Sequence, residues 1–146
     1  MSKLISTLEQ LHRIRTRAVD DMSLRLASQK QLCRSFEKNI AALSNFADGM
    51  ATSTYTSAAQ MFNQASYKYS IQRVIDWQKQ EQALADIEAR TIQGHLLNEV
   101  RREKSLSIVL DNKRADHQRD SLIREQKMND AVSAQCWMRQ QILRPR

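Results

Sequence analysis

The chain has 146 residues, of which 41% are hydrophobic, 5% aromatic and 27% charged, enough for one small domain or a single elongated element. Its only proline is Pro145 and its only glycines are Gly49 and Gly94, so the residues that turns require are almost missing and a multi-stranded sheet is excluded. Twenty-three Lys and Arg against sixteen Asp and Glu give a formal charge of +7, which favours an acidic partner: a protein, a nucleic acid or a membrane surface.

Residues 4–47 are predicted to form a first helix. Apolar residues recur there at spacings that alternate between three and four, which is typical of one helix of a coiled coil. They are Leu4, Leu8, Leu11, Ala18, Met22, Leu26, Cys33, Phe36, Ile40, Leu43 and Ala47. Arg15 and Gln29 interrupt the pattern. The two four-residue steps from Ala18 to Leu26 resemble a stutter, which locally unwinds a supercoil.

Residues 48–56 form the predicted turn. Gly49 is expected to take the left-handed conformation that ends a helix, and Ser57 with Gln60 has the capping-box spacing that begins one. Residues 57 to about 141 are predicted to form the second helix. Only Gly94 weakens it, by about 1 kcal/mol relative to alanine, and the sequence leaves open whether the helix bends or breaks there. The expected fold class is therefore all-α: one domain spanning residues 1–146, a long antiparallel coiled-coil hairpin whose second helix is longer than its first.

If the turn is centred near Ser53, residue i of the first helix lies opposite a residue of the second helix whose number is about 106 minus i. Residues after about Leu106 then have no partner, and residues 111–121 are expected to form a solvated or frayed helix. Apolar residues return later without a matching strip on the first helix, which predicts a docking site. They are Leu122, Ile123, Met128, Val132, Cys136, Trp137, Met138, Ile142 and Leu143. The alternative is a tail that folds back or is disordered in the free protein.

The sequence indicates no catalytic or metal centre. His12, His95 and His117 are scattered without an HExxH motif, so each is expected to be a solvated helix residue. Cys33 and Cys136 lie far apart without a CxxC spacing, which predicts neither a disulfide nor a zinc site but two buried or half-buried helix residues. Two glycines cannot supply a phosphate-binding loop. We therefore expect no enzyme activity and no cofactor.

No apolar run approaches the roughly 20 residues that cross a bilayer, and no secretory signal is recognisable. The sequence therefore predicts a cytoplasmic protein without a membrane span. Basic residues alternate with acidic ones, as on a solvated helix face, rather than forming the basic run of a DNA-reading helix.

Several residues resemble the first helix of the flagellar export protein FliJ family. They are Leu8, Leu11, Val19, Asp20, Asp21, Cys33, Leu43 and Phe46. The later stretch from Gln126 to Val132, followed by Met138 and Arg139, is similar to the C-terminal pattern of that family. Asp130 and Val132 match the pattern, whereas Ala131 stands where an acidic residue is usual. The resemblance covers nearly the whole chain.

The resemblance implies a non-enzymatic, stalk-like component of the flagellar type III export apparatus, peripherally associated with the inner membrane. The implied partners are the hexameric export ATPase (FliI-like), the cytoplasmic domain of the export-gate membrane protein (FlhA-like) and export chaperones. The implied ATPase-binding residues are Arg13, Arg17, Arg124, Lys127, Asp130, Val132 and Arg139. The implied gate-binding residues are Tyr67, Ile71, Val74, Ile75 and Gln78. Ile71, Val74 and Gln78 also fit a seam that faces the first helix.

Two other classes of function stay open beside this one. A basic coiled coil that binds nucleic acid predicts steeply salt-dependent binding to DNA. A structural homodimer, in which helices pair between chains, predicts a sedimentation coefficient different from that of a monomer. The sequence also leaves open whether a flagellar system or a type III injectisome is served.

Overall fold

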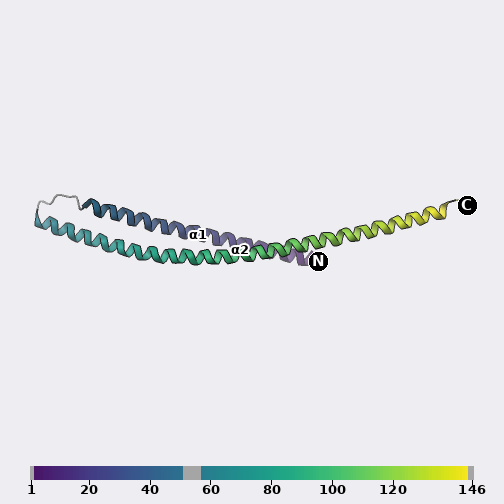
Figure 1. Cartoon of the computed structure of the whole chain (residues 1–146), viewed down its shortest axis with the longest axis horizontal. Helices are drawn as coiled ribbons and strands as arrows, with labels where there is room; N and C mark the ends of the chain where they lie inside the picture. The colour runs from purple at the N-terminus through teal and green to yellow at the C-terminus, as the bar shows by residue number, and fades with distance from the viewer. Residues whose placement is uncertain (1, 51–56, 145–146) are drawn as a thin grey trace. The chain divides into compact units, whose positions relative to one another are not determined.

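The computed structural model describes residues 2–50 and 57–144, and these form two helices. Helix α1 spans Ser2–Met50 and helix α2 spans Ala58–Leu143 (Figure 1). No strand occurs among the described residues, so the predicted all-α class, with a second helix longer than the first, is confirmed. Most of the predicted turn, residues 51–56, lies outside the described residues.

The chain divides into two compact units, and each contains a part of both helices. The central unit comprises Arg17–Val100, and the terminal unit comprises Met1–Thr16 with Arg101–Arg146. In the central unit the two helices lie side by side and antiparallel (Figure 1). Met22 of α1 lines a surface depression with Glu99 of α2. Gln29, which follows Met22 along α1, contacts Ala85, which precedes Glu99 along α2. The two helices therefore run in opposite directions.

The central unit is held together by a narrow seam. On α1 the seam residues are Val19, Met22, Leu26, Gln29, Cys33, Phe36, Ile40, Leu43, Ala47 and Met50. On α2 they are Ile71, Ile75, Gln78, Gln82, Ala85, Ala89, Ile92, Leu96 and Glu99. All are buried or half-buried, and the spacing alternates strictly between three and four, as in a coiled coil. Few side chains are fully covered, because each helix has only one neighbour.

Two details of the predicted seam are wrong. Gln29 does not interrupt it, because its side-chain Nε2 donates a hydrogen bond of 3.0 Å to the backbone oxygen of Ala85. The small Ala85 side chain, 6% exposed, lets the amide of Gln29 come this close to the backbone of α2. There is also no stutter, because the half-buried Val19 restores the three-residue step to Met22.

The pairing register differs from the predicted one. A register of about 106 minus i would place Gln29 opposite Trp77, but Gln29 bonds Ala85 and Trp77 is 56% exposed. The first turns of α2 explain the offset, because residues 58–63 are all exposed and Gln64 is the first to be half-buried. Pairing with α1 therefore begins later along α2 than a symmetric turn would require.

The structure tests both predicted helix caps. The Ser57 hydroxyl accepts a hydrogen bond of 3.2 Å from the backbone N–H of Gln60, as the predicted N-cap requires. Gly49, in contrast, lies within α1, and no described glycine has a positive φ. The expectation of a left-handed Gly49 is therefore wrong.

Gly94 neither ends nor interrupts α2, which is assigned as one continuous helix. A Cβ atom added at Gly94 would meet nothing within 4 Å. We expect Gly94→Ala to raise the free energy of unfolding by about 0.5–1 kcal/mol, because alanine loses less backbone entropy in a helix. Urea unfolding followed by circular dichroism measures this change.

Gly94→Pro is the opposing control, since it removes a helical hydrogen bond and should lower the unfolding midpoint. If Gly94→Ala lowers the urea midpoint of unfolding, the prediction that position 94 behaves as an ordinary exposed helix position is wrong.

The two cysteines differ sharply in their surroundings. Both are free, but Cys33 is buried in the seam and Cys136 is exposed, so the expectation that both are at least half-buried is wrong for Cys136. Burial, followed by a hydrogen bond to Asp86 and the negative charge of that residue, raises the pKa of the Cys33 thiol. At a given pH this thiol therefore carries less of the reactive thiolate.

Thiol alkylation near neutral pH is expected to modify Cys136 rapidly and Cys33 slowly. Cys33→Ser and Cys136→Ser each leave one thiol, so mass spectrometry can follow each rate alone. In denaturant both thiols should react at similar rates, because burial no longer disfavours the thiolate of Cys33. Similar rates in the folded protein would contradict the burial of Cys33.

Candidate functional site

The seam of the terminal unit is partly polar. Its residues are Ile5, Leu8, His12 and Arg15 on α1, and Glu103, Leu106, Leu110, Lys113, His117 and Asp120 on α2. The spacing alternates between three and four as in the central unit. The predicted seam residues Leu4 and Leu11 are instead 47% and 44% exposed, and the seam positions beside them hold Ile5 and His12. Arg15, expected to interrupt the seam, is one of its half-buried members.

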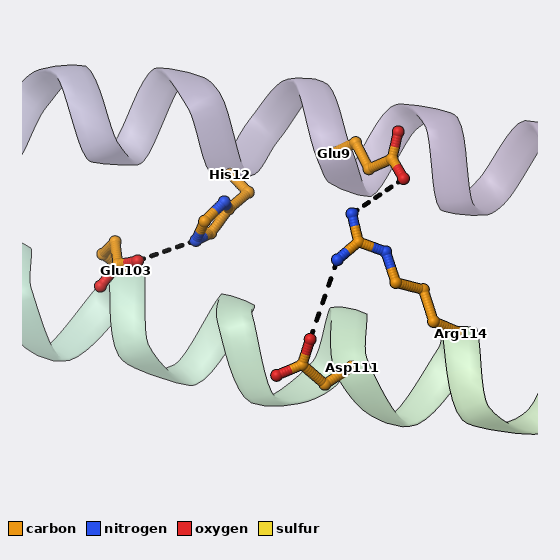
Figure 2. A network of polar contacts seen from close by, with 5 residues as sticks. All are labelled: Glu9, His12, Glu103, Asp111 and Arg114. Carbon is orange, nitrogen blue, oxygen red and sulfur yellow. Dashed lines mark hydrogen bonds and ion pairs between the residues drawn. The ribbon is translucent and has the colours of Figure 1, made fainter.

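Charged side chains link the two helices of this unit (Figure 2). His12 Nε2 lies 2.8 Å from the Glu103 carboxylate, and Arg114 donates a hydrogen bond of 2.9 Å to Glu9. Arg114 also lies 3.8 Å from Asp111. His12 is therefore a half-buried seam residue, and so is His117, so the expectation of a solvated histidine is wrong for both. The two cross-helix pairs, His12 with Glu103 and Arg114 with Glu9, favour one register, because a shift along the seam would separate them.

Pairing reaches further along α2 than the sequence predicted. Leu110 is only 2% exposed, and Lys113, His117 and Asp120 are half-buried. The expectation of a solvated helix over residues 111–121 is met by eight of its eleven residues, which are helical and exposed, but not by the half-buried Lys113, His117 and Asp120. The exposed part of α2 begins at Ser121, and we call residues 121–144 the C-terminal segment.

Every residue of the C-terminal segment is exposed. The segment is helical as far as Leu143. Its large apolar side chains are between 45% and 81% exposed, and they are Leu122, Ile123, Met128, Val132, Trp137, Met138, Ile142 and Leu143. Apolar side chains gathered in this way indicate a surface that another molecule covers.

The C-terminal segment presents apolar side chains on two sides. At 3.6 residues per turn, Met128, Val132, Met138 and Ile142 fall within an arc of about 120°. Trp137 lies on the opposite side of the helix. A partner can therefore meet a methionine-rich surface on one side and an aromatic surface on the other.

The structure brings together some of the candidate ATPase-binding residues but not all of them. Five lie on the C-terminal segment and are exposed: Arg124, Lys127, Asp130, Val132 and Arg139. Arg13 instead lines a depression with Leu110 and Arg114, and Arg114 precedes Arg124 by about 15 Å along the helix. Arg17 belongs to the central unit. The seven residues therefore do not form one cluster.

The candidate gate-binding residues also divide into two groups. Ile75 is 3% exposed, and Ile71 and Gln78 are half-buried in the seam, so contact with α1 covers these three. Tyr67 is exposed, and so is Val74, which the seam interpretation had placed against α1. Their spacing of seven residues puts them on one side of α2.

Trp77 is a large surface residue that the apolar spacing did not single out. It is 56% exposed and lines a shallow depression with Ser70, Arg73 and Val74. The signal was present, because Trp77 follows Val74 by three residues and so lies on the same side of α2.

The described residues contain no group of three or more His, Cys, Asp or Glu side chains that could hold a metal ion. Within the same residues, neither helix has a stretch long and apolar enough to span a bilayer. The candidate sites that the structure offers are surfaces on α2.

These features define a coiled-coil protein of two antiparallel helices with an exposed C-terminal helical segment. The chain belongs to the FliJ family, since the family model described as "Flagellar FliJ protein" matches residues 4–141. A search of curated proteins and a search of solved structures each found no match. The predicted resemblance is confirmed, and the family makes the chain a component of the flagellar export apparatus.

Proposed function

We propose that this chain is a non-enzymatic, cytoplasmic accessory protein that binds the hexameric export ATPase through its C-terminal segment. Family membership supports a role in the export apparatus. The observation that carries the binding step is the complete exposure of residues 121–144 together with their large apolar side chains. Covering such side chains is favourable by about 25 cal/mol for each Å² of apolar surface removed from water.

The two different sides of the segment suggest how binding acts on a ring of identical subunits. A single helix within a ring presents Met128 and Val132 to some subunits and Trp137 to others. The segment then binds different subunits with different affinities and shifts their conformational equilibria without any chemistry of its own. A tenfold difference in affinity between two subunit states corresponds to about 1.4 kcal/mol.

The charged side chains of the C-terminal segment help to orient it against the ATPase. Positive charge around the apolar side chains comes from Arg124, Lys127, Arg139 and Arg144, and negative charge comes from Glu125 and Asp130. Exposed charges at the edge of an interface mainly affect the association rate and the choice of partner. We therefore assign most of the affinity to the apolar side chains.

The test compares Val132→Asp with Ser133→Asp. Both substitutions add one negative charge to an exposed position of the same helical turn, but only the first removes an apolar side chain. We expect Val132→Asp to weaken co-migration with the purified ATPase hexamer by about tenfold or more and to abolish stimulation of ATP turnover. Ser133→Asp should keep most of both activities.

Helicity should be unchanged in both variants, because neither position is covered by α1. If the unsubstituted chain neither co-migrates with the ATPase nor stimulates it, the proposal is wrong. Equal losses in the two variants would indicate a general effect of charge rather than an apolar contact.

We propose a second contact, in which the cytoplasmic domain of the export-gate protein binds the exposed side of α2 that carries Tyr67 and Val74. Trp77 enlarges this surface, because it lies beside Val74. Ile71, Ile75 and Gln78 support the surface from the seam instead of contacting the gate. Export chaperones are the third class of partner, and binding to the gate accounts for peripheral association with the inner-membrane apparatus.

Val74→Ala and Ile75→Ala form a matched pair for the gate contact. Val74→Ala is expected to weaken binding to the purified gate domain and to leave the melting temperature nearly unchanged. Ile75→Ala should destabilise the hairpin by about 2–4 kcal/mol, because it removes a buried side chain from the seam. Binding measured by isothermal titration calorimetry, with thermal unfolding in parallel, separates the two effects. Unchanged gate binding by Val74→Ala would count against this surface.

A homodimer is the alternative that the exposed C-terminal segment also favours. Two segments that pair with each other would cover the same apolar side chains. Sedimentation equilibrium of the free chain distinguishes the two, since the proposed function requires a monomer whose segment is available to the ATPase. A stable dimer that dissociates when Val132 is replaced by Asp would show that the C-terminal segment binds a second copy of the chain, and would contradict its assignment to the ATPase.

A further inference from the structure

The last turns of the C-terminal segment carry only positive charge. Both acidic residues of the segment, Glu125 and Asp130, lie in its first half. Residues 131–144 include no acidic residue, but they include two arginines, Arg139 and Arg144. This part of α2 is therefore a short basic stretch within a helix of otherwise mixed charge.

No carboxylate of the same helix neutralises these arginines. An acidic residue reaches an arginine on a helix when the two are three or four residues apart, and the nearest acidic residue, Asp130, precedes Arg139 by nine residues. Helix α1 does not cover this part of α2, since every residue of the C-terminal segment is exposed. Guanidinium groups stay charged at all physiological pH values, so both arginines present fixed positive charge to the solvent.

Large apolar side chains lie beside the two arginines, and we call residues 137–144 the Trp137 stretch. Its apolar members are between 60% and 81% exposed, and they are Trp137, Met138, Ile142 and Leu143. They form two adjacent pairs rather than a three-four series, and neighbours on a helix point about 100° apart. A second helix that packs along one narrow stripe therefore cannot cover all four side chains.

We propose that the Trp137 stretch binds the surface of an anionic lipid bilayer. Tryptophan rings favour the level of the lipid headgroups, and arginines lay their apolar stems along the boundary while their charged ends meet the headgroup phosphates. Apolar side chains on more than one side of the helix can enter the acyl boundary, because fluid lipid needs no matching stripe. The stretch measures about 12 Å along the helix, against about 30 Å for a hydrocarbon core, so the contact is with the surface of the bilayer.

The chemistry favours lipid over nucleic acid as the anionic partner. A nucleic acid offers phosphates to Arg139 and Arg144, but no fluid apolar phase that would cover Ile142 and Leu143. An anionic bilayer satisfies both kinds of side chain together. This inference goes beyond the proposed function and does not rest on it, although Trp137 takes part in both contacts.

The chain has two tryptophans, and they provide the test with its control. Trp77→Phe leaves only Trp137, and Trp137→Phe leaves only Trp77, which lies in the central unit. The probe is a vesicle of phosphatidylcholine with about one third phosphatidylglycerol. On addition of vesicles we expect the fluorescence of Trp77→Phe to shift to shorter wavelength, because the indole ring of Trp137 leaves water. The emission of Trp137→Phe should stay unchanged.

Arg139→Glu and Arg90→Glu form the matched pair of charge variants. Each reverses one charge at an exposed position of α2, but only Arg139 belongs to the Trp137 stretch. In flotation of the full chain with the anionic vesicles, Arg139→Glu is expected to weaken binding by about tenfold or more, and Arg90→Glu by less than about twofold. Vesicles of phosphatidylcholine alone should bind the unsubstituted chain at least about tenfold more weakly. Circular dichroism checks that the helices persist in each variant.

Several outcomes would overturn the proposal. A shift in the emission of Trp77 instead of Trp137 would place the contact elsewhere. Equal losses for Arg139→Glu and Arg90→Glu would show attraction to net charge alone, and equal binding to neutral vesicles would remove the arginines from the contact. Binding to a DNA duplex that Arg139→Glu abolishes, without binding to vesicles, would assign the stretch to nucleic acid.

The two proposals fail separately. A chain that stimulates the ATPase but ignores anionic vesicles would contradict this inference and leave the proposed function standing. A chain that binds the vesicles through Trp137 but neither co-migrates with the ATPase nor stimulates it would support this inference and contradict the proposed function.

Discussion

A helix with a single neighbour can bury only one narrow face, and this constraint governs both units of the protein. The seam of each unit follows a strict three-four repeat, yet only a handful of apolar side chains in it are buried, such as Ile75, Ile92 and Leu110. Half-burial makes polar seam residues tolerable, because water or a partner across the seam can satisfy them. It also leaves the other faces of both helices open to other molecules.

Polar residues in the seam have a second consequence, which is the choice of register. Gln29 reaches one particular backbone oxygen, that of Ala85, and His12 reaches one particular carboxylate, that of Glu103. Leucines at these positions would pack acceptably in several alignments, whereas a half-buried polar group finds its hydrogen-bond partner in one. The register in turn decides which residues α1 covers and where the exposed C-terminal segment begins.

The interaction surfaces differ in chemistry, and this difference suits different partners. The C-terminal segment is apolar on two sides, which favours an enclosing partner such as a ring. The side of α2 with Tyr67, Val74 and Trp77 is aromatic and exposed. Under the proposed function, one protein can in this way contact several components of the export apparatus.

The two helices and the greater length of the second could be predicted from the amino-acid pattern, because turn-forming residues are scarce and the apolar spacing persists for many turns. The family could be predicted as well, from the resemblance of particular residues. The amino-acid pattern did not determine the register, since a three-four repeat matches itself again after a shift of one heptad. Neighbouring residues such as Leu11 and His12, or Val74 and Ile75, could also not be assigned to the seam or to the surface from spacing alone, because more than one series of residues with three-four spacing runs along each helix. These assignments follow from the packing of α1 against α2, because cross-helix contacts such as that of Gln29 with Ala85 exist in one alignment and not in the others.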